Sequence, residues 1–311
     1  MPVYLIALLV GLVMLVLGAE LLVRGGGKLA LALRVPALVV GLTVVAFGTS
    51  TPELAVSVTA AFRASTDMAL ANVTGSNIAN IALVLGLAAL VSPIEVERSL
   101  IRREVPVAVI LQALVPVMCL DGRISRLEGL LLLVLGVSYN GWLVWDAIRR
   151  RPSLAESDLD IEEGGDLRWN IVLLVAGIAV LLGGAQFFVG GATAIAHRLG
   201  LSDRFIGLTV VALGTSAPEL ATGVVSAYRG EADLALGNSV GSNILNITMV
   251  LATTSMIRPI VVGDRHAVGD AFVALGVTAL LIPMVLRGRK VSRTEGALMA
   301  VGYVLYLVLS P

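Results

Sequence analysis

One apolar motif occurs twice in this chain and constrains its fold more than any other feature. The first copy, GLTVVAFGTSTPEL, runs from Gly41 to Leu54, and the second, GLTVVALGTSAPEL, runs from Gly207 to Leu220, so that aligned residues lie 166 positions apart. Each copy places a glutamate directly after a proline inside a long apolar segment. A carboxylate in such a segment is costly unless a cation or another polar group meets it. The repetition therefore predicts two internal repeats that bring two buried carboxylates to one site.

The composition places these repeats in a membrane. Hydrophobic residues make up 57% of the chain, charged residues make up 14%, and the mean hydropathy is +0.95. A soluble domain usually carries about 25% charged residues. An apolar run of roughly 20 residues can cross a bilayer as a helix. Such runs are predicted near residues 3–23, 36–62, 68–91, 104–120, 125–148, 169–196, 203–228, 233–257, 267–286 and 294–309. We therefore expect an all-α integral membrane protein with ten transmembrane helices.

The repeat extends over nearly the whole chain. DMALANVTGSNIANIALVLG at 67–86 aligns with DLALGNSVGSNILNITMVLA at 233–252, and SRLEG at 125–129 aligns with SRTEG at 292–296. Each half holds five predicted spans, and this odd number makes the second copy enter the membrane in the opposite direction. Ion sites of secondary transporters with inverted repeats lie near the midplane, where the repeats meet. The predicted five-helix halves are residues 1–148 and 168–311, joined by a polar segment at 149–167.

The distribution of basic residues predicts the orientation. If the first span starts outside, alternation places most of the 22 Lys and Arg residues in inward loops. The positive-inside rule then puts both termini outside the cytoplasm and the acidic linker 149–167 inside. The first span belongs to the repeat, since GAELLVRGG at 18–26 recurs as GAQFFVGGA at 184–192, so it is not a cleaved signal peptide. We expect a multi-pass protein of a prokaryotic plasma (inner) membrane, and a formal charge of zero gives no basic field for nucleic acid.

Oxygen-bearing residues recur at helical spacing in both copies. Thr49 and Glu53 are four residues apart, so they share one helix face. Pro52 has no backbone N–H, and we expect it to leave the carbonyls of residues 46–48 without helical partners. Carboxylates, hydroxyls and carbonyls are the ligands that Ca²⁺ takes, about six to eight at a time. The pattern also includes Ser50, Ser76 and Asn80 in the first half and Thr215, Ser216, Glu219, Ser242 and Asn246 in the second.

Simpler interpretations exist for these polar residues. Ser, Thr and Asn commonly form hydrogen bonds between membrane helices, although such bonds do not require the same spacing in two inverted copies. A salt bridge could satisfy Glu53 and Glu219, but Lys and Arg occur only at the ends of their spans. Glu20 has Arg24 four residues later, which predicts a local ion pair rather than an ion ligand.

The motifs resemble those of a known family. GTSTPE at 48–53 and GTSAPE at 214–219, each followed by GSNIxN, are similar to the two alpha repeats of the sodium/calcium exchanger family in the cation/calcium antiporter superfamily. The resemblance covers essentially the whole chain and implies alpha motifs at 41–80 and 207–246, with four ion sites between the second, third, seventh and eighth spans. The implied Ca²⁺ ligands are Glu53, Glu219, Thr49 and Thr215. The implied Na⁺ ligands are Ala46, Thr49, Ser50, Glu53, Ser76, Asn80, Ala212, Thr215, Ser216, Glu219, Ser242 and Asn246.

The resemblance also implies a function. We expect secondary active antiport of Na⁺ against Ca²⁺ by alternating access, with the first and sixth spans sliding past the others, no cofactor, and a monomer in lipid as the working unit. Two ionised carboxylates are neutralised by one Ca²⁺ or two Na⁺, so the family's three-to-one exchange would carry one net charge. An acid at the position of Asn246 accompanies K⁺ co-transport in one branch of the family, so we expect K⁺ independence.

Other functions fit parts of the pattern. The nearest is an antiporter of the same superfamily that exchanges protons for Ca²⁺ or another divalent cation, although the Gly-Asn-containing motif usual there is absent. An intramembrane enzyme could use Glu53 and Glu219 as acid and base, but the sequence offers no nucleophile, phosphate loop or Cys and His cluster beside them. A passive channel would favour rings of ligands from several subunits.

Overall fold

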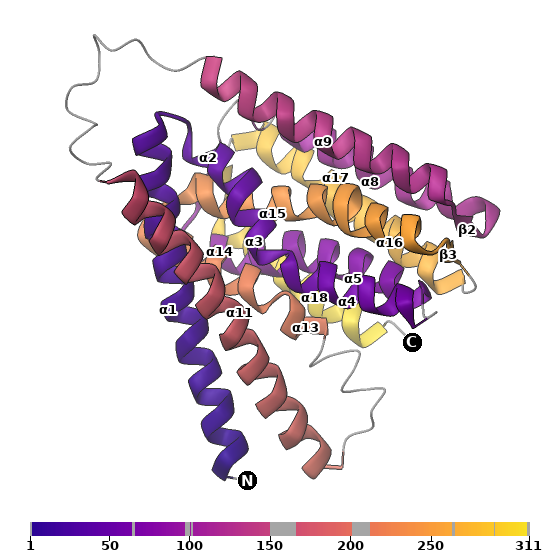
Figure 1. The fold of residues 1–311 in the computed structure, drawn as a ribbon, viewed down its shortest axis with the longest axis horizontal. Coiled ribbons are helices and arrows are strands. Elements are labelled where there is room, and N and C mark those ends of the chain that lie inside the picture. Colours follow the sequence, from indigo (N-terminus) through magenta and orange to yellow (C-terminus); the bar gives the residue numbers. More distant parts are fainter. Residues whose placement is uncertain are drawn as a thin grey trace.

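The protein is a bundle of helices, here described from a computed structural model (Figure 1). The structure describes residues 2–63, 66–96, 100, 102–149, 166–200, 212–262, 265–288 and 290–309. Most of the predicted acidic linker at 149–167 and the first residues of the second alpha motif, 207–211, lie outside these ranges.

Helices account for nearly all of the described chain. Those of the first half are α1 (Pro2–Leu33), α2 (Ala37–Val40), η1 (Gly41–Val45), α3 (Ala46–Thr49), α4 (Thr51–Phe62), α5 (Thr66–Ala79), η2 (Asn80–Leu85), α6 (Gly86–Val91), α8 (Glu104–Met118), η3 (Cys119–Asp121) and α9 (Arg126–Arg149). Those of the second half are α11 (Leu167–Arg198), α13 (Ala212–Thr215), α14 (Ala217–Arg229), α15 (Ala232–Leu245), η6 (Asn246–Leu251), α16 (Ala252–Ile257), α17 (Arg265–Gly288) and α18 (Arg293–Leu309).

These helices confirm a multi-pass membrane protein. Among the described residues, 7 helices are long and apolar enough to cross a membrane, or up to 8 if the bent pair Ala37–Thr49 and Thr51–Phe62 forms one span. The predicted spans at 203–228 and 294–309 are not among them. Residues 201–211 lie outside the description, and α18 has only 17 residues. The count of ten spans therefore stays a prediction.

Two helical segments form the centre of the bundle. In the segments Met68–Val91 and Ala232–Ile257, 78% of the apolar window is buried, whereas in Arg126–Arg149 and Leu167–Arg198 the values are 22% and 28%. The central segments contain the two GSNIxN motifs, and the outer helices expose large apolar side chains such as Val137. An apolar exterior around a polar-containing core suits a lipid environment. The motifs are thus held where the protein is most enclosed.

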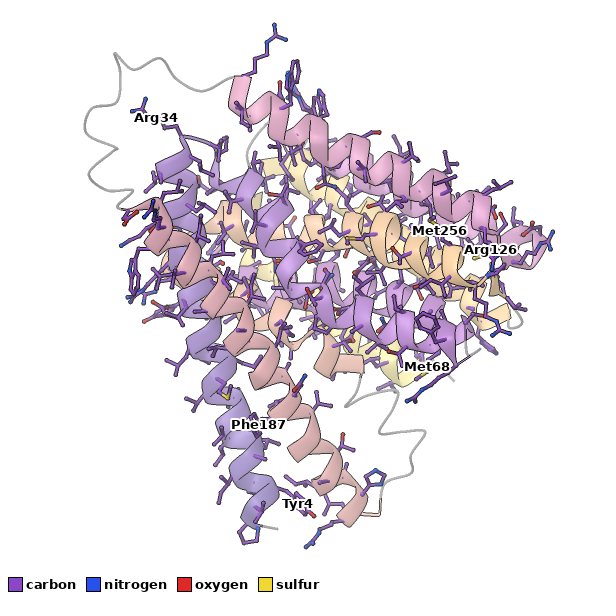
Figure 2. The ribbon with its side chains drawn as sticks, in the orientation of Figure 1. Tyr4, Arg34, Met68, Arg126, Phe187 and Met256 are labelled. Atoms are coloured by element: carbon purple, nitrogen blue, oxygen red, sulfur yellow. The ribbon has the colours of Figure 1, made fainter. Side chains whose placement is uncertain are left out.

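Helices α1 and α11 pack antiparallel along a seam of glycines. Figure 1 shows the pair lying along one side of the other helices, and Figure 2 labels Tyr4 and Phe187 on it. A Cβ added at Gly11 would lie 2.3 Å from the backbone nitrogen of Phe188, and one at Gly25 would lie 2.8 Å from that of Leu174. The seam glycines recur every seventh residue: Gly11, Gly18 and Gly25 on α1, and Gly177, Gly184 and Gly191 on α11. Only glycine allows backbones of membrane helices to approach this closely.

The seam corrects one predicted boundary. The first span was expected to end near residue 23, but α1 continues to Leu33. Glycine lowers helix propensity, which made Gly25–Gly27 a plausible end. The gain from packing Gly25 against α11 outweighs that propensity, so this segment is a close helix contact rather than a bend.

Loops of the two halves pair across the bundle. Strand β1 (Ile94–Glu95) pairs antiparallel with β4 (Lys290–Val291), and β2 (Arg123–Ile124) pairs with β3 (Ile260–Val261). In each pair one strand comes from the first half of the chain and one from the second. The two pairs therefore tie the halves together at their loops.

The SRxEG repeats cap helices at these loops. Ser125 and Glu128 exchange hydrogen bonds in a capping box at the start of α9, and Ser292 and Glu295 do the same at α18. The Arg126 side chain, beside Met256 in Figure 2, donates to the carbonyl of Ile257 at 3.2 Å. Arg293 donates to the carbonyl of Val91, also at 3.2 Å. Each half thus caps the C-terminus of a central helix of the other.

The predicted ion pair of Glu20 with Arg24 is confirmed and has a third member. Arg229, at the end of α14, also contacts Glu20, with its Nε 2.9 Å from Oε2. Glu20 therefore links α1 to α14 as well as to its own helix, in keeping with a role in structure.

The glycine seam makes a testable prediction on α11. Gly184→Ala should lower the stability of the detergent-solubilised protein by about 1–3 kcal/mol, because added volume in a tight contact forces backbones apart. Its Cβ would lie 2.8 Å from the backbone nitrogen of Leu15. Gly190→Ala is the matched control, since no atom lies within 4 Å of its Cβ. If both variants melted at the wild-type temperature, the claim that close packing at Gly184 stabilises the protein would be contradicted.

Candidate cation site

In each alpha motif the helix is broken at the serine that lies two residues before the proline. Ser50 (φ −80°, ψ 5°) separates α3 from α4, and the two segments around it are bent by 45°. Ser216 (φ −86°, ψ 7°) separates α13 from α14 in the same way. The prolines fall in the first turn of the new helix, where a missing N–H has little cost. The break places Glu53 and Glu219 in the first turns of α4 and α14.

The expectation of freed carbonyls is wrong for two of the three residues, Ala46 and Phe47. Ser50 donates its backbone N–H to the carbonyl of Ala46 at 3.0 Å, and the Thr51 hydroxyl donates to that of Phe47 at 3.0 Å. Pro52 removes only the N–H that would reach Gly48, four residues earlier. The helix therefore keeps its bonding up to the break, with a side chain replacing one backbone donor.

The two glutamates are brought together by crossed hydrogen bonds. Both are 0% exposed. Ser50, from the first motif, donates to Oε1 of Glu219 at 3.3 Å, and Ser216, from the second, lies 3.5 Å from Oε1 of Glu53. Ser76 also donates to Oε1 of Glu53 at 3.3 Å. The halves of the chain thus share one cluster of buried polar side chains, here called the polar pocket, in which each carboxylate is contacted by the serine of the other motif.

Each glutamate keeps one oxygen free. Oε2 of Glu53 and Oε2 of Glu219 are buried and have no hydrogen-bond partner among the described residues. The ion pairs found in the described part of the chain involve Glu20 and Asp146, and neither Glu53 nor Glu219 has a basic partner there. A buried charge needs a partner, because leaving water is expensive. The free oxygens can supply two carboxylate ligands to a cation.

Among the other predicted ligands, Thr49 and Ser242 contact each other. The Thr49 hydroxyl donates to Oδ1 of Asn238 at 3.0 Å and lies 3.4 Å from the Ser242 hydroxyl. Its counterpart Thr215 is 9% exposed, at the end of α13. Ala46 is fully buried at the start of α3, and Ala212 begins α13, where the structure describes only its backbone.

The predicted asparagine ligands begin two π-helical segments. Asn80 opens η2 and Asn246 opens η6, and both residues are 0% exposed. Their Oδ1 atoms are buried, and no hydrogen-bond partner for them occurs in the described part of the chain. A π-turn is rare and is often found at functional sites. A hydrophobic period of 3.6 residues predicts an α-helix and gives no sign of a π-turn. In this protein a π-turn nevertheless begins at the matching positions Asn80 and Asn246.

Several residues of the site were missed by the sequence analysis. Asn72 donates to the carbonyl of Glu53 at 3.2 Å and to the Ser57 hydroxyl at 3.0 Å. Three further side chains, Asn77, Asn243 and Gln112, bond to one another or to the predicted ligands. The asparagines at positions 72 and 77 align with asparagines at 238 and 243. The occurrence of the same polar residue in both repeats could therefore have indicated that these positions belong to the site. Gln112 lies outside the motifs and has no such signal.

Comparison with known proteins places the chain in a family. The sequence model described as sodium/calcium exchanger protein matches residues 3–145 and 169–310. CaxA of Alkalimonas amylolytica, a candidate antiporter by its name, is 39% identical over 310 residues, covering 98% of this chain and 97% of CaxA. The sodium/calcium exchanger MaX1 of Methanosarcina acetivorans is 32% identical over 339 residues, covering 97% of each protein.

A solved structure agrees with these relatives. The sodium-calcium exchanger NCX_Mj, soaked with 10 mM Na⁺ and zero Ca²⁺, superposes with a TM-score of 0.87 at 32% identity, covering 99% of each chain. A polytopic helical fold around a buried polar pocket defines a membrane transport protein, and membership makes this chain a transporter rather than an enzyme. The chain belongs to the sodium/calcium exchanger family.

The free carboxylate oxygens predict that cations stabilise the fold. Adding Ca²⁺ to ion-free protein in detergent should raise the melting temperature, since a ligand at 100 times its Kd stabilises the folded state by about 2.7 kcal/mol. The double variant Glu53→Gln/Glu219→Gln keeps the side-chain shapes without the charges and should show no such rise. Glu95→Gln, on the exposed end of β1, is the control and should respond as the wild type does. A persistent rise in the double variant would place the cation elsewhere.

Proposed function

We propose that this protein is a secondary active antiporter that exchanges Na⁺ for Ca²⁺ across the membrane by alternating access. The proposal rests chiefly on the two fully buried carboxylates of Glu53 and Glu219, each with a free oxygen and without a basic partner among the described residues. Family membership and the exchange named for MaX1 and NCX_Mj support the choice of ions.

Overlapping ligands explain how the two ions compete. In our proposal, Ca²⁺ binds between Glu53 and Glu219 with oxygens of Thr49 and Thr215. Na⁺ uses the same groups together with the serine hydroxyls and the free amide oxygens. The Na⁺ set is Ala46, Thr49, Ser50, Glu53, Ser76, Asn80, Ala212, Thr215, Ser216, Glu219, Ser242 and Asn246. Because both ions need both carboxylates, binding of one excludes the other.

The proposed architecture has ten spans in two inverted five-helix repeats, residues 1–148 and 168–311. The matching strand pairs and the matching caps of Arg126 and Arg293 support an internal two-fold relation. We place both termini outside the cytoplasm and the linker 149–167 inside it, in a prokaryotic plasma membrane. The whole pocket is built by one chain, so a monomer in lipid suffices for exchange.

Alternating access requires part of the bundle to move. We propose that α1 and α11 slide as a unit past the other helices. The glycine seam supports this, because it joins the pair by backbone contact, whereas α11 covers the pocket with apolar side chains. Ile178 contacts Gly48 and Val189 contacts Gly214, so a Cβ at either glycine would lie within 2.5 Å of them. A smooth apolar contact of this kind permits α11 to slide over the pocket, whereas movement of α1 requires the Glu20–Arg229 ion pair to break and re-form.

Transport in proteoliposomes tests the exchange. Radioactive Ca²⁺ should accumulate in Na⁺-loaded vesicles and not in choline-loaded ones, with or without K⁺. Glu53→Gln and Glu219→Gln should each reduce uptake at least about tenfold, since losing a charged contact costs about 1.5–3 kcal/mol. Glu95→Gln should transport normally. Uptake driven by a proton gradient without Na⁺ would instead identify a proton/calcium antiporter, and a requirement for K⁺ would contradict K⁺ independence.

Charge predicts the stoichiometry. Three Na⁺ would exceed the two ionised carboxylates by one charge, and Asn246 adds none. Moving that charge through the membrane potential is worth about 2.3 kcal/mol per 100 mV. An inside-positive potential should therefore accelerate Ca²⁺ uptake into Na⁺-loaded vesicles, and an inside-negative one should slow it. Equal rates at both potentials would indicate an electroneutral two-to-one exchange.

A further inference from the structure

The first of the two asparagines in each GSNIxN motif lies beside the predicted ligands without being one of them. Asn77 and Asn243 occupy matching positions on α5 and α15, and they are 0% and 1% exposed. Each forms hydrogen bonds with the opposite half of the chain. Their bonds determine which way two neighbouring amides face, and this has a direct consequence for cation binding.

The first chain of bonds begins at a backbone carbonyl, which can only accept. Asn243 donates its Nδ2 to the carbonyl oxygen of Asn77 at 3.1 Å. The amide of Asn243 is therefore fixed, and its Oδ1 accepts from Nδ2 of Asn80 at 3.1 Å. Since the donor of Asn80 is used here, its Oδ1 faces away, and that atom is buried without a hydrogen-bond partner in the ranges that the structure describes.

The second chain repeats this arrangement from the other half. Asn77 donates Nδ2 to the carbonyl of Asn243 at 3.5 Å and to Oε1 of Gln112 at 2.8 Å. Its Oδ1 therefore accepts from Nδ2 of Asn246 at 3.0 Å. Oδ1 of Asn246 is left buried, and no described residue donates a hydrogen bond to it.

Amide orientation decides whether asparagine can bind a cation. The amide oxygen is a ligand, whereas the NH₂ group is a donor that repels a positive ion. The two ends have nearly the same size, so packing alone does not select between them. Only hydrogen bonds do, and a buried polar group in the wrong orientation loses them.

We propose that Asn77 and Asn243 are positioning residues that turn the amide oxygens of Asn246 and Asn80, respectively, toward the cation. This inference rests on the proposed function. It assigns distinct pairs: Asn77 acts on Asn246, and Asn243 acts on Asn80. Gln112, on α8, extends the first pair from outside the motifs by holding the donor end of Asn77.

A double-mutant cycle in which Asp replaces Asn246 or Asn80 tests the pairing. Both terminal atoms of Asp are oxygens, so either one can face the cation and no positioning residue is needed. Asn77→Ala should weaken equilibrium binding of radioactive Ca²⁺ by about tenfold in the wild-type background, because Asn246 loses the hydrogen bond that orients its buried amide. In the Asn246→Asp background the same substitution should cost less than about twofold.

Asn80→Asp is the matched control, because it adds the same charge to the same pocket at the partner of Asn243. Asn77→Ala should still cost about tenfold in that background. Conversely, Ca²⁺ binding that is weakened by Asn243→Ala should be restored by Asn80→Asp and not by Asn246→Asp. Should Asn77→Ala fail to fold, this mirror comparison carries the test.

The outcomes separate the two levels of the proposal. Equal losses in all backgrounds would make the asparagines structural only, and equal rescue by both Asp variants would show an effect of charge alone. Either result overturns the pairing. Wild-type protein that fails to bind Ca²⁺, or Glu53→Gln protein that still binds it as tightly, would instead overturn the proposed function.

Discussion

Two carboxylates buried in one pocket without a counter-charge are the constraint on which the rest of this structure depends. Glu53 and Glu219 are fully enclosed, and the broken helices around Ser50 and Ser216 bring them together. Serine hydroxyls satisfy one oxygen of each carboxylate and leave the other free. In the proposed mechanism a cation in this pocket offsets the two carboxylate charges, which couples ion occupancy to the energy of the fold.

The packing around the pocket distinguishes a centre with many polar bonds from the α1 and α11 side, which we propose to slide. The central segments are the most buried part of the bundle and carry amides that bond from one half to the other. The pair α1 and α11 is joined internally by backbone contacts at glycine, and Glu20 ties α1 to Arg229 of α14. Polar bonds thus fix the ligands, while apolar contacts cover them. An exchanger needs both, because its ligands must keep their geometry while access to them changes.

Sequence alone predicted the features that depend on local spacing. Helices expected at 104–120 and 233–257 are found at Glu104–Met118 and Ala232–Ile257, and Ser50, Ser76 and Ser216 lie beside the glutamates. Features that depend on a distant partner were not predicted. The extension of α1 to Leu33 requires α11, the π-turns at Asn80 and Asn246 depart from the 3.6-residue period, and the pairing of Asn77 with Asn246 joins helices far apart in the sequence. The predicted ion ligands, the ten-span count and the membrane orientation stay predictions.

The most direct measurement of the central claim is an anomalous-difference map from crystals grown ion-free and then soaked in Ca²⁺. We expect one strong Ca²⁺ peak between Oε2 of Glu53 and Oε2 of Glu219. Its distance from each of these two oxygens should be roughly 2.3–2.6 Å, as Ca²⁺ coordination requires. That peak should disappear when the crystals are soaked in excess Na⁺. A map with no peak between the two carboxylates, or with Ca²⁺ bound only at the acidic surface of the protein, would contradict it.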